Sequence, residues 1–158
     1  MKAVTIKKIK DELQHRSTND LIALCLQLSK FKKENKELLT YLLFESENEE
    51  RYIESIKEQL NLLFNNINTN SFFYIRKSMR KILSLIKKHI RYSKNKETEV
   101  ILLLFYCQKL KNFRPSIQKS PRLQNVFDRQ IILIKKALSA LHEDLQFEYQ
   151  YELDALLK

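Results

Sequence analysis

The sequence predicts an all-α protein, and two observations carry that prediction. Apolar residues recur every three or four positions along nearly the whole 158-residue chain, which is the period of an amphipathic helix. The chain contains no glycine, although average usage of about 7% would give roughly eleven, and tight hairpin turns need glycine for positive φ. Hydrophobic residues are 44% and charged residues 30%, as in ordinary folded proteins. We expect one all-helical domain over residues 1–158.

Four helices are expected in the first half of the chain. The apolar spacing places them at about 6–13, 17–31, 34–46 and 49–67. Ser17 is a good cap for the second helix, and Asp20 three residues later makes it close to a capping box. We expect four leucines of the third helix to face inward: Leu38, Leu39, Leu42 and Leu43. Asparagines near the expected helix ends are the next-best residues for a left-handed cap: Asn66, Asn68, Asn95 and Asn112.

The second half should contain two or three more helices, for a total of six to seven. A fifth is expected over 71–93, and a sixth over 97–111 is nearly apolar all round at its centre, which favours a central place in the core. The two prolines, Pro115 and Pro121, bracket the clearest loop, near 112–121. Ser120 followed by Pro121 is a strong helix start.

The last helix is expected to be long, over about 121–157. Its apolar positions step by four and three as in a heptad seam: Phe127, Ile131, Ile134, Leu138, Leu141 and Leu145. The seam could pack on the protein's own helices or form a homodimer through the C-terminal helix.

Two architectures fit this order of helices. Lys36–Glu45 and Thr98–Cys107 are both Leu-rich helices with a polar start, and the tightly joined second and third helices resemble one hairpin of a HEAT-like α-solenoid. The similarity between these two segments does not recur at a fixed period, as a repeat array would require. An irregular helical bundle and a short α-solenoid therefore both remain open.

The most specific feature is a basic helix face. Residues 70–96 contain nine cations and no acid, a net charge of +9. At about 100° per residue, eight cations share one side of the helix and the aliphatic residues share the other. We call these eight the basic face: Arg76, Lys77, Arg80, Lys81, Lys87, Lys88, Arg91 and Lys94. Because like charges at i,i+4 repel, this arrangement predicts that something anionic or solvent compensates it.

Three interpretations of the basic face compete. The face could be solvated or could meet the chain's own acids, since residues 45–59 carry six glutamates and two cations. It could bind a nucleic-acid backbone, which the net charge of +10 and pI near 9.6 favour, with Phe72, Phe73, Tyr74 and Tyr92 as possible stacking groups, although a core role is expected first. It could bind an acidic protein or an anionic membrane surface. A second stretch, Gln108–Arg122, has five cations and no acid.

Catalytic and metal-binding signatures are weak. The absence of glycine disfavours phosphate-binding loops, and no nucleophile elbow, whose turn requires glycine, occurs in the sequence. Glu12 and His15 have the spacing of a di-metal helix pair, but His89 and His142 lack the matching glutamate. Asp144, Glu148 and Glu152 form a carboxylate row that we expect to be solvated. No metal, cofactor or catalytic residue is therefore expected.

The expected role follows from these exclusions. The longest apolar run, Val100–Cys107, is far short of the roughly 20 residues of a membrane-spanning helix, and the N-terminus does not look like a secretion signal. Cys25 and Cys107 are expected to be buried, reduced thiols. The sequence favours a cytoplasmic, non-enzymatic protein-interaction or scaffold module. The alternatives are a sequence-nonspecific nucleic-acid-binding protein and an enzyme without a local motif.

Overall fold

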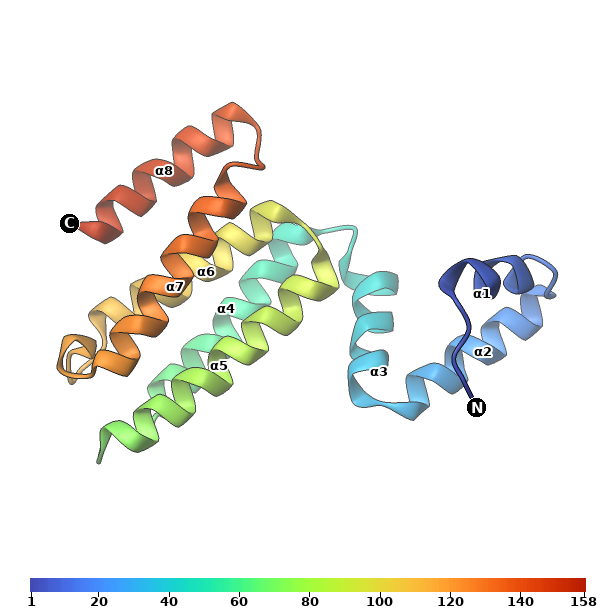
Figure 1. Ribbon diagram of the computed structural model, residues 1–158, viewed down its shortest axis with the longest axis horizontal. Helices are drawn as coiled ribbons and strands as arrows, with labels where there is room; N and C mark the ends of the chain where they lie inside the picture. The colour runs from blue at the N-terminus through green and yellow to red at the C-terminus, as the bar shows by residue number, and fades with distance from the viewer. The chain divides into compact units, whose positions relative to one another are not determined.

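The computed structural model describes every residue, Met1–Lys158, and confirms the all-α class. The chain forms two compact units, Met1–Phe44 (unit 1) and Glu45–Lys158 (unit 2), and the expectation of a single domain stays a prediction. There are eight α-helices, against six to seven expected: α1 Ile6–Leu13, α2 Thr18–Phe31, α3 Lys33–Thr40, α4 Glu49–Asn65, α5 Phe72–Ser93, α6 Lys96–Asn112, α7 Pro121–Leu138 and α8 Glu143–Leu157 (Figure 1). None of them combines the length and apolar character that crossing a membrane requires.

Unit 1 contains α1, α2 and α3, and its helix starts follow the sequence closely. The capping box at the start of α2 forms, since Asp20 N–H donates to Ser17 Oγ over 3.1 Å and the Asp20 carboxylate accepts from Ser17 N–H over 3.4 Å. The amide of Asn35 donates to the Leu28 carbonyl over 2.8 Å, which ties the start of α3 to the end of α2. A five-residue π-helix, Tyr41–Glu45, continues α3.

Burial in unit 1 differs from the prediction. Tyr41 is its only buried residue. Leu42 and Leu43, expected to face inward, are 54% and 61% exposed, and Cys25, expected to be buried, is exposed. These three predictions are wrong because helical period tells which residues share a face, while burial depends on whether another element covers that face.

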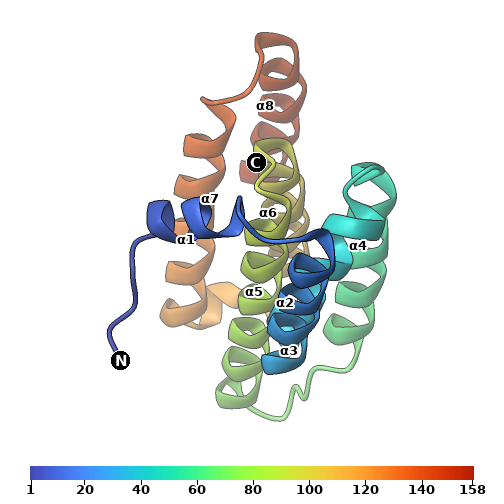
Figure 2. The ribbon, with the colours of Figure 1, turned by 90° about the vertical axis from the view of Figure 1, so that its right-hand side faces the viewer.

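Unit 2 packs around α6, as the apolar character of that helix predicts. Helix α6 contacts α4, α5, α7 and α8, and in Figure 2 these helices lie alongside it. Val100, Leu102, Leu103 and Leu110 are all but fully buried, and the Cys107 thiol is buried as expected. Burial raises the pKa of Cys107 to about 12, since an apolar site disfavours the thiolate.

Side-chain hydrogen bonds join the helices of unit 2 at defined points. The Glu49 carboxylate, in the first turn of α4, accepts from the Ser93 hydroxyl at the end of α5 and from the Thr98 hydroxyl in α6, the latter over 2.5 Å. The Tyr106 hydroxyl donates to the Met79 carbonyl over 3.0 Å. The Glu49 bonds fix the start of α4 against the end of α5 and the start of α6, and the Tyr106 bond joins α5 and α6 along their length.

Two more hydrogen bonds attach α8 to α6. The Tyr149 hydroxyl donates to the Glu97 carboxylate over 2.7 Å, near the start of α6. The Lys111 ammonium donates to the Leu156 carbonyl over 2.5 Å, at the end of α6. Burial, together with this bond to Glu97, raises the pKa of Tyr149. The two contacts match increasing residue numbers in both helices, so α8 runs in the same direction as α6.

The prediction of one long C-terminal helix over 121–157 is wrong, because the chain turns at residues 139–142, between α7 and α8. His142 caps the new helix, and its Nδ1 accepts from the Asp144 backbone N–H over 3.4 Å. Four seam residues of α7 are buried, Phe127, Ile131, Ile134 and Leu138, and α7 packs on α6. The alternative of packing on the protein's own helices therefore describes this seam, which is not left exposed for a homodimer.

The loop before α7 lies where the prolines predict it, but the predicted asparagine caps at helix ends differ from the structure. Helix α7 begins at Pro121 after Ser120, as predicted, and a short 3-10 turn, Ile117–Lys119, lies in the preceding loop. The one residue with positive φ is Lys94, at 55°, which ends α5. Asn95 instead caps the start of α6 by accepting from Glu97 N–H over 2.9 Å, so the expected asparagine left-handed caps do not form.

Candidate functional site

Helix α5 carries the basic face because its two sides differ as the sequence predicts. Ile75, Met79, Ile82, Leu83 and Ile86 are buried, and α5 contacts α4 and α6. On the other side Lys77, Arg80, Lys81, Lys87, Arg91 and Lys94 are exposed, while Arg76 and Lys88 are part-exposed. The core therefore holds the helix in place and presents the cations to solvent.

Seven of the eight cations of the basic face make no ion pair with the protein's own acids: Arg76, Lys77, Arg80, Lys81, Lys87, Arg91 and Lys94. Lys88 does have an interaction partner. The interpretation in which the chain's own glutamates compensate the face thus fails for most of it. If no partner is bound, these seven cations are compensated by solvent.

Two glutamates of residues 45–59, and Glu99 of α6, interact with residues other than these seven cations. Glu54 of α4 pairs with Lys57 of the same helix over 2.8 Å, and Glu49 binds the hydroxyls of Ser93 and Thr98. In α6, Glu99 pairs with Lys96 over 2.7 Å. The i,i+3 pairs and the interhelical bonds of Glu49 leave the charge of these seven cations available to a partner.

Three like-charge pairs at i,i+4 remain along α5, namely Arg76–Arg80, Lys77–Lys81 and Lys87–Arg91. Each such pair destabilises a helix by roughly 0.2–0.5 kcal/mol, so together they cost about 1 kcal/mol. An anion bound across the face would remove this repulsion in addition to its direct attraction.

Exposed aromatic rings lie at the start of the same helix. Phe73 is 62% exposed and Tyr74 46% exposed, and their rings meet edge to face with centroids 5.5 Å apart. The expectation that these aromatics belong to the core is wrong for this pair and holds for Tyr92, which is buried. Two accessible rings therefore lie within four residues of the cations Arg76 and Lys77.

The second basic stretch, Gln108–Arg122, is only partly available. Lys111 is bound to the Leu156 carbonyl, and the Lys109 ammonium lies 5.4 Å from the centroid of the Phe105 ring. Arg114, Lys119 and Arg122 are exposed. Because α6 returns antiparallel to α5, this loop lies at the end of unit 2 where α5 begins (Figure 1).

The weak metal and catalytic candidates are not brought together. Glu12 pairs with Arg16 over 2.6 Å rather than with a second ligand set around His15, and no group of three potential ligands forms a metal site. His89 Nδ1 lies 2.7 Å from the Tyr52 hydroxyl. The carboxylates of Asp144, Glu148 and Glu152 are exposed along α8, as expected of a solvated row.

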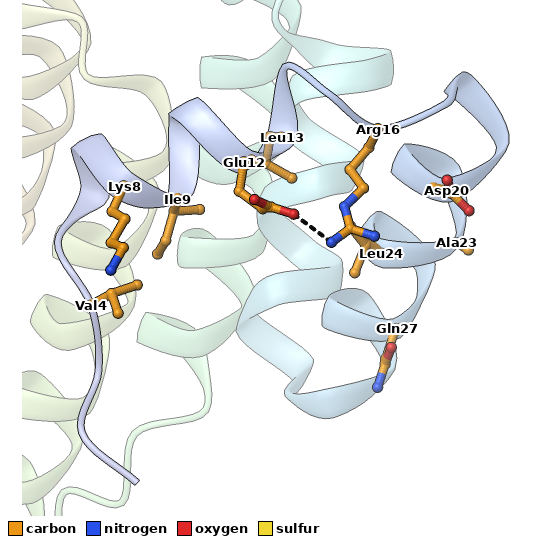
Figure 3. Close-up of a pocket in the computed structure, with 10 residues that line it drawn as sticks. All are labelled: Val4, Lys8, Ile9, Glu12, Leu13, Arg16, Asp20, Ala23, Leu24 and Gln27. Carbon is orange, nitrogen blue, oxygen red and sulfur yellow. Dashed lines mark hydrogen bonds and ion pairs between the residues drawn. The ribbon is translucent and has the colours of Figure 1, made fainter.

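A groove between α1 and α2 is a feature that sequence reasoning missed. It has a volume of about 590 Å³, and its apolar lining includes Val4, Ile9, Leu13 and Leu24. Figure 3 shows Lys8, Glu12, Arg16 and Asp20 following one another along it. The available signal was that α2 has apolar residues all round, including Ile22, Leu24, Leu26 and Leu28, which one neighbouring helix cannot cover.

Comparisons with known proteins add no further constraint on this site. No protein-family model matches the chain, and no curated protein or solved structure is significantly similar to it.

Proposed function

We propose that this protein is a non-enzymatic, cytoplasmic interaction module that binds an acidic protein surface through the basic face of α5. The observation that carries the proposal is the set of seven cations that project from a core-anchored helix without an intramolecular ion pair. The helix backbone that carries these cations is already held by the core, so association has to order only their side chains, which lowers its entropic cost.

The electrostatics of the chain support this role. Its net charge of +10 attracts anionic partners over about one Debye length, about 8 Å at physiological salt, and speeds their association. Binding would also relieve the repulsion between neighbouring cations of α5. The interaction should therefore weaken as salt concentration rises.

The test compares two variants of equal net charge. One carries Lys77→Gln, Arg80→Gln and Lys87→Gln on α5; the other carries Arg129→Gln, Lys135→Gln and Lys136→Gln, which are exposed cations of α7. Binding of a fluorescent glutamate-rich peptide is measured by anisotropy at several salt concentrations.

The α5 variant should bind roughly tenfold more weakly than the natural protein, because each lost exposed ion pair removes about 0.5 kcal/mol. The α7 variant should keep nearly the natural affinity. Equal losses in both variants would mean that net charge alone attracts the peptide, and the absence of binding at low salt would end the proposal.

A second candidate function is binding of single-stranded nucleic acid, and exposed Phe73 and Tyr74 favour it specifically. Aromatic side chains stack on unpaired bases while neighbouring cations neutralise phosphates, whereas an acidic peptide gains little from them. The exposed cations Arg114 and Lys119 of the loop and Arg122 at the start of α7 lie at the same end of the unit and could extend such a site.

The discriminating variants are Phe73→Ser with Tyr74→Ser, and the matched control Phe147→Ser at an aromatic of α8 that is 82% exposed. If nucleic acid is bound, the paired change should cost about 1–3 kcal/mol per stacked base and leave peptide binding intact. The α5 Gln variant should also lower the slope of log affinity against log salt by about 2, since each phosphate contact contributes about 0.7. No change for an oligothymidine probe would reject this candidate.

A further inference from the structure

Unit 1 exposes apolar side chains on α1, on α2 and in the π-helix that follows α3. Helices α1, α2 and α3 contain no buried residue. Large hydrophobic side chains at least two-fifths exposed include Ile6, Ile9, Ile22, Leu26, Leu28 and Phe31. Soluble monomers rarely expose continuous apolar patches of more than a few hundred Å², so this surface indicates a missing partner.

Helix α1 is too short to be stable in water without a partner. It has eight residues, whereas isolated helices below about 12–15 residues are marginal in water. Its apolar residues Ile9 and Leu13 face the α1–α2 groove rather than a closed core. Covering that groove would bury the apolar sides of both helices together.

The charges along the groove indicate what covers it. From one end to the other they alternate as Lys8, Glu12, Arg16 and Asp20, positive, negative, positive and negative (Figure 3). A two-fold axis through the middle of this row would place Lys8 opposite Asp20 of a second copy, and Glu12 opposite Arg16. Every facing pair would then be attractive.

We propose that the α1–α2 groove is a two-fold interface through which two copies of this chain associate. In such an interface the same patch meets itself, so it must be self-complementary, and four alternating charges over a shared apolar lining meet that requirement. A strongly acidic partner or nucleic acid would instead favour a positive rim, and these four charges sum to zero. The proposal goes beyond the binding role of α5 and does not depend on it.

The experiment exchanges the central charges between copies. The full-length chain with Glu12→Arg would face like charges when it pairs with itself, and so would the chain with Arg16→Glu. Mixed with each other, the two variants would restore both attractive pairs. Neither residue belongs to the Ser17–Asp20 capping box, and the Glu12–Arg16 pair within one chain is exposed, so its loss should affect folding little.

Sedimentation velocity gives the association constants, and native mass spectrometry identifies the mixed dimer, because the two variants differ in mass. Each variant alone should dimerise roughly tenfold more weakly than the natural chain, and their mixture should recover the natural affinity as a heterodimer. Glu54→Arg and Lys57→Glu exchange the equivalent local pair of α4 and serve as the control, with no change in dimerisation and no preference for mixed pairs.

The proposal is overturned if the natural chain stays monomeric as concentration increases. It is also overturned if the chain dimerises but the Glu12→Arg and Arg16→Glu variants show no preference for each other, because the dimer would then use another surface. Circular dichroism of each variant gives its helix content, and recovery of dimers in the mixture shows independently that both chains are folded. Peptide binding through α5 is measured separately, so either result leaves the proposed function to its own test.

Discussion

The hydrogen bond from Thr98 to Glu49 offers the sharpest test of how unit 2 is held together. Thr98 is fully buried, and its hydroxyl donates to the Glu49 carboxylate over 2.5 Å. Thr98→Val keeps the shape of the side chain and removes the donor. Because hydrogen bonds to charged groups contribute about 1.5–3 kcal/mol, and the Ser93 hydroxyl still serves the same carboxylate, we expect a loss near the low end, about 1.5 kcal/mol.

Urea unfolding followed by circular dichroism measures this loss. With an m-value of about 2 kcal/mol/M, the midpoint should fall by roughly 0.7 M while m stays unchanged. Thr69→Val, at an exposed loop threonine, is the matched control and should shift stability by less than about 0.5 kcal/mol.

A double-mutant cycle with Glu49→Gln separates the bond from other effects of burial. If the bond carries the loss, Thr98→Val should cost less in the Glu49→Gln background, with a coupling of about 1 kcal/mol. A Thr98→Val protein as stable as the natural one, or a loss that is identical in both backgrounds, would refute the role assigned to this carboxylate.

Three further predictions concern single positions. Lys94→Asn should stabilise the protein by a few tenths of a kcal/mol to about 1 kcal/mol, because asparagine tolerates the left-handed conformation better than lysine, whereas Lys81→Asn within α5 should destabilise it; thermal unfolding checks both. Cys25 should react with a thiol reagent in the native state, and Cys107 only after unfolding. Because folding raises the Cys107 pKa from 9.0 to about 12, the unfolded thiol loses its proton first, and the free energy of unfolding should fall as pH increases from about 9 to 12. Urea unfolding of the natural chain and of Cys107→Ala at several pH values would measure this fall. Gln130→Met should raise the urea midpoint by the equivalent of about 1 kcal/mol. The buried Gln130 Oε1 has no hydrogen-bond partner, and removing that penalty should outweigh the loss of the bond from Gln130 Nε2 to the Val126 carbonyl; a lower midpoint would contradict this.

The sequence predicted two helices of unit 2, α5 and α6, from how their apolar and charged residues are distributed around the helix axis. Helix α5 separates aliphatic residues from cations, and its buried side is the one expected, from Ile75 to Ile86. Helix α6 is apolar on all sides at its centre and contacts four helices. The prediction succeeds for α5 because only one orientation avoids burying charge, and for α6 because a helix without a polar side at its centre is covered by other helices.

The break between α7 and α8 could not be read from apolar spacing, because Leu138, Leu141 and Leu145 keep the step of the seam across the turn. Charge carried the better signal. Lys135 and Lys136 lie in the last turn of α7, and Glu143 and Asp144 lie in the first turn of α8, which is how charges are placed at a helix end and a helix start.

The sequence alone predicts the basic face, but it does not predict the α1–α2 groove. A helix wheel places the cations of α5 on one side without knowledge of any neighbour. The groove depends on how α1 packs beside α2, and the fate of Leu42, Leu43 and Cys25 depends on which surfaces are covered. One-dimensional patterns do not contain that information.

The attachment of α8 has a consequence for the dynamics of the chain. Terminal helices commonly fray, and their amides then exchange with solvent faster than those of the core. Helix α8 is instead anchored at Tyr149 and at Leu156 to the two ends of α6, with Leu153 fully buried between them. Its amides should therefore exchange in step with those of α6, as one cooperative unit, and opening one helix should require opening the other.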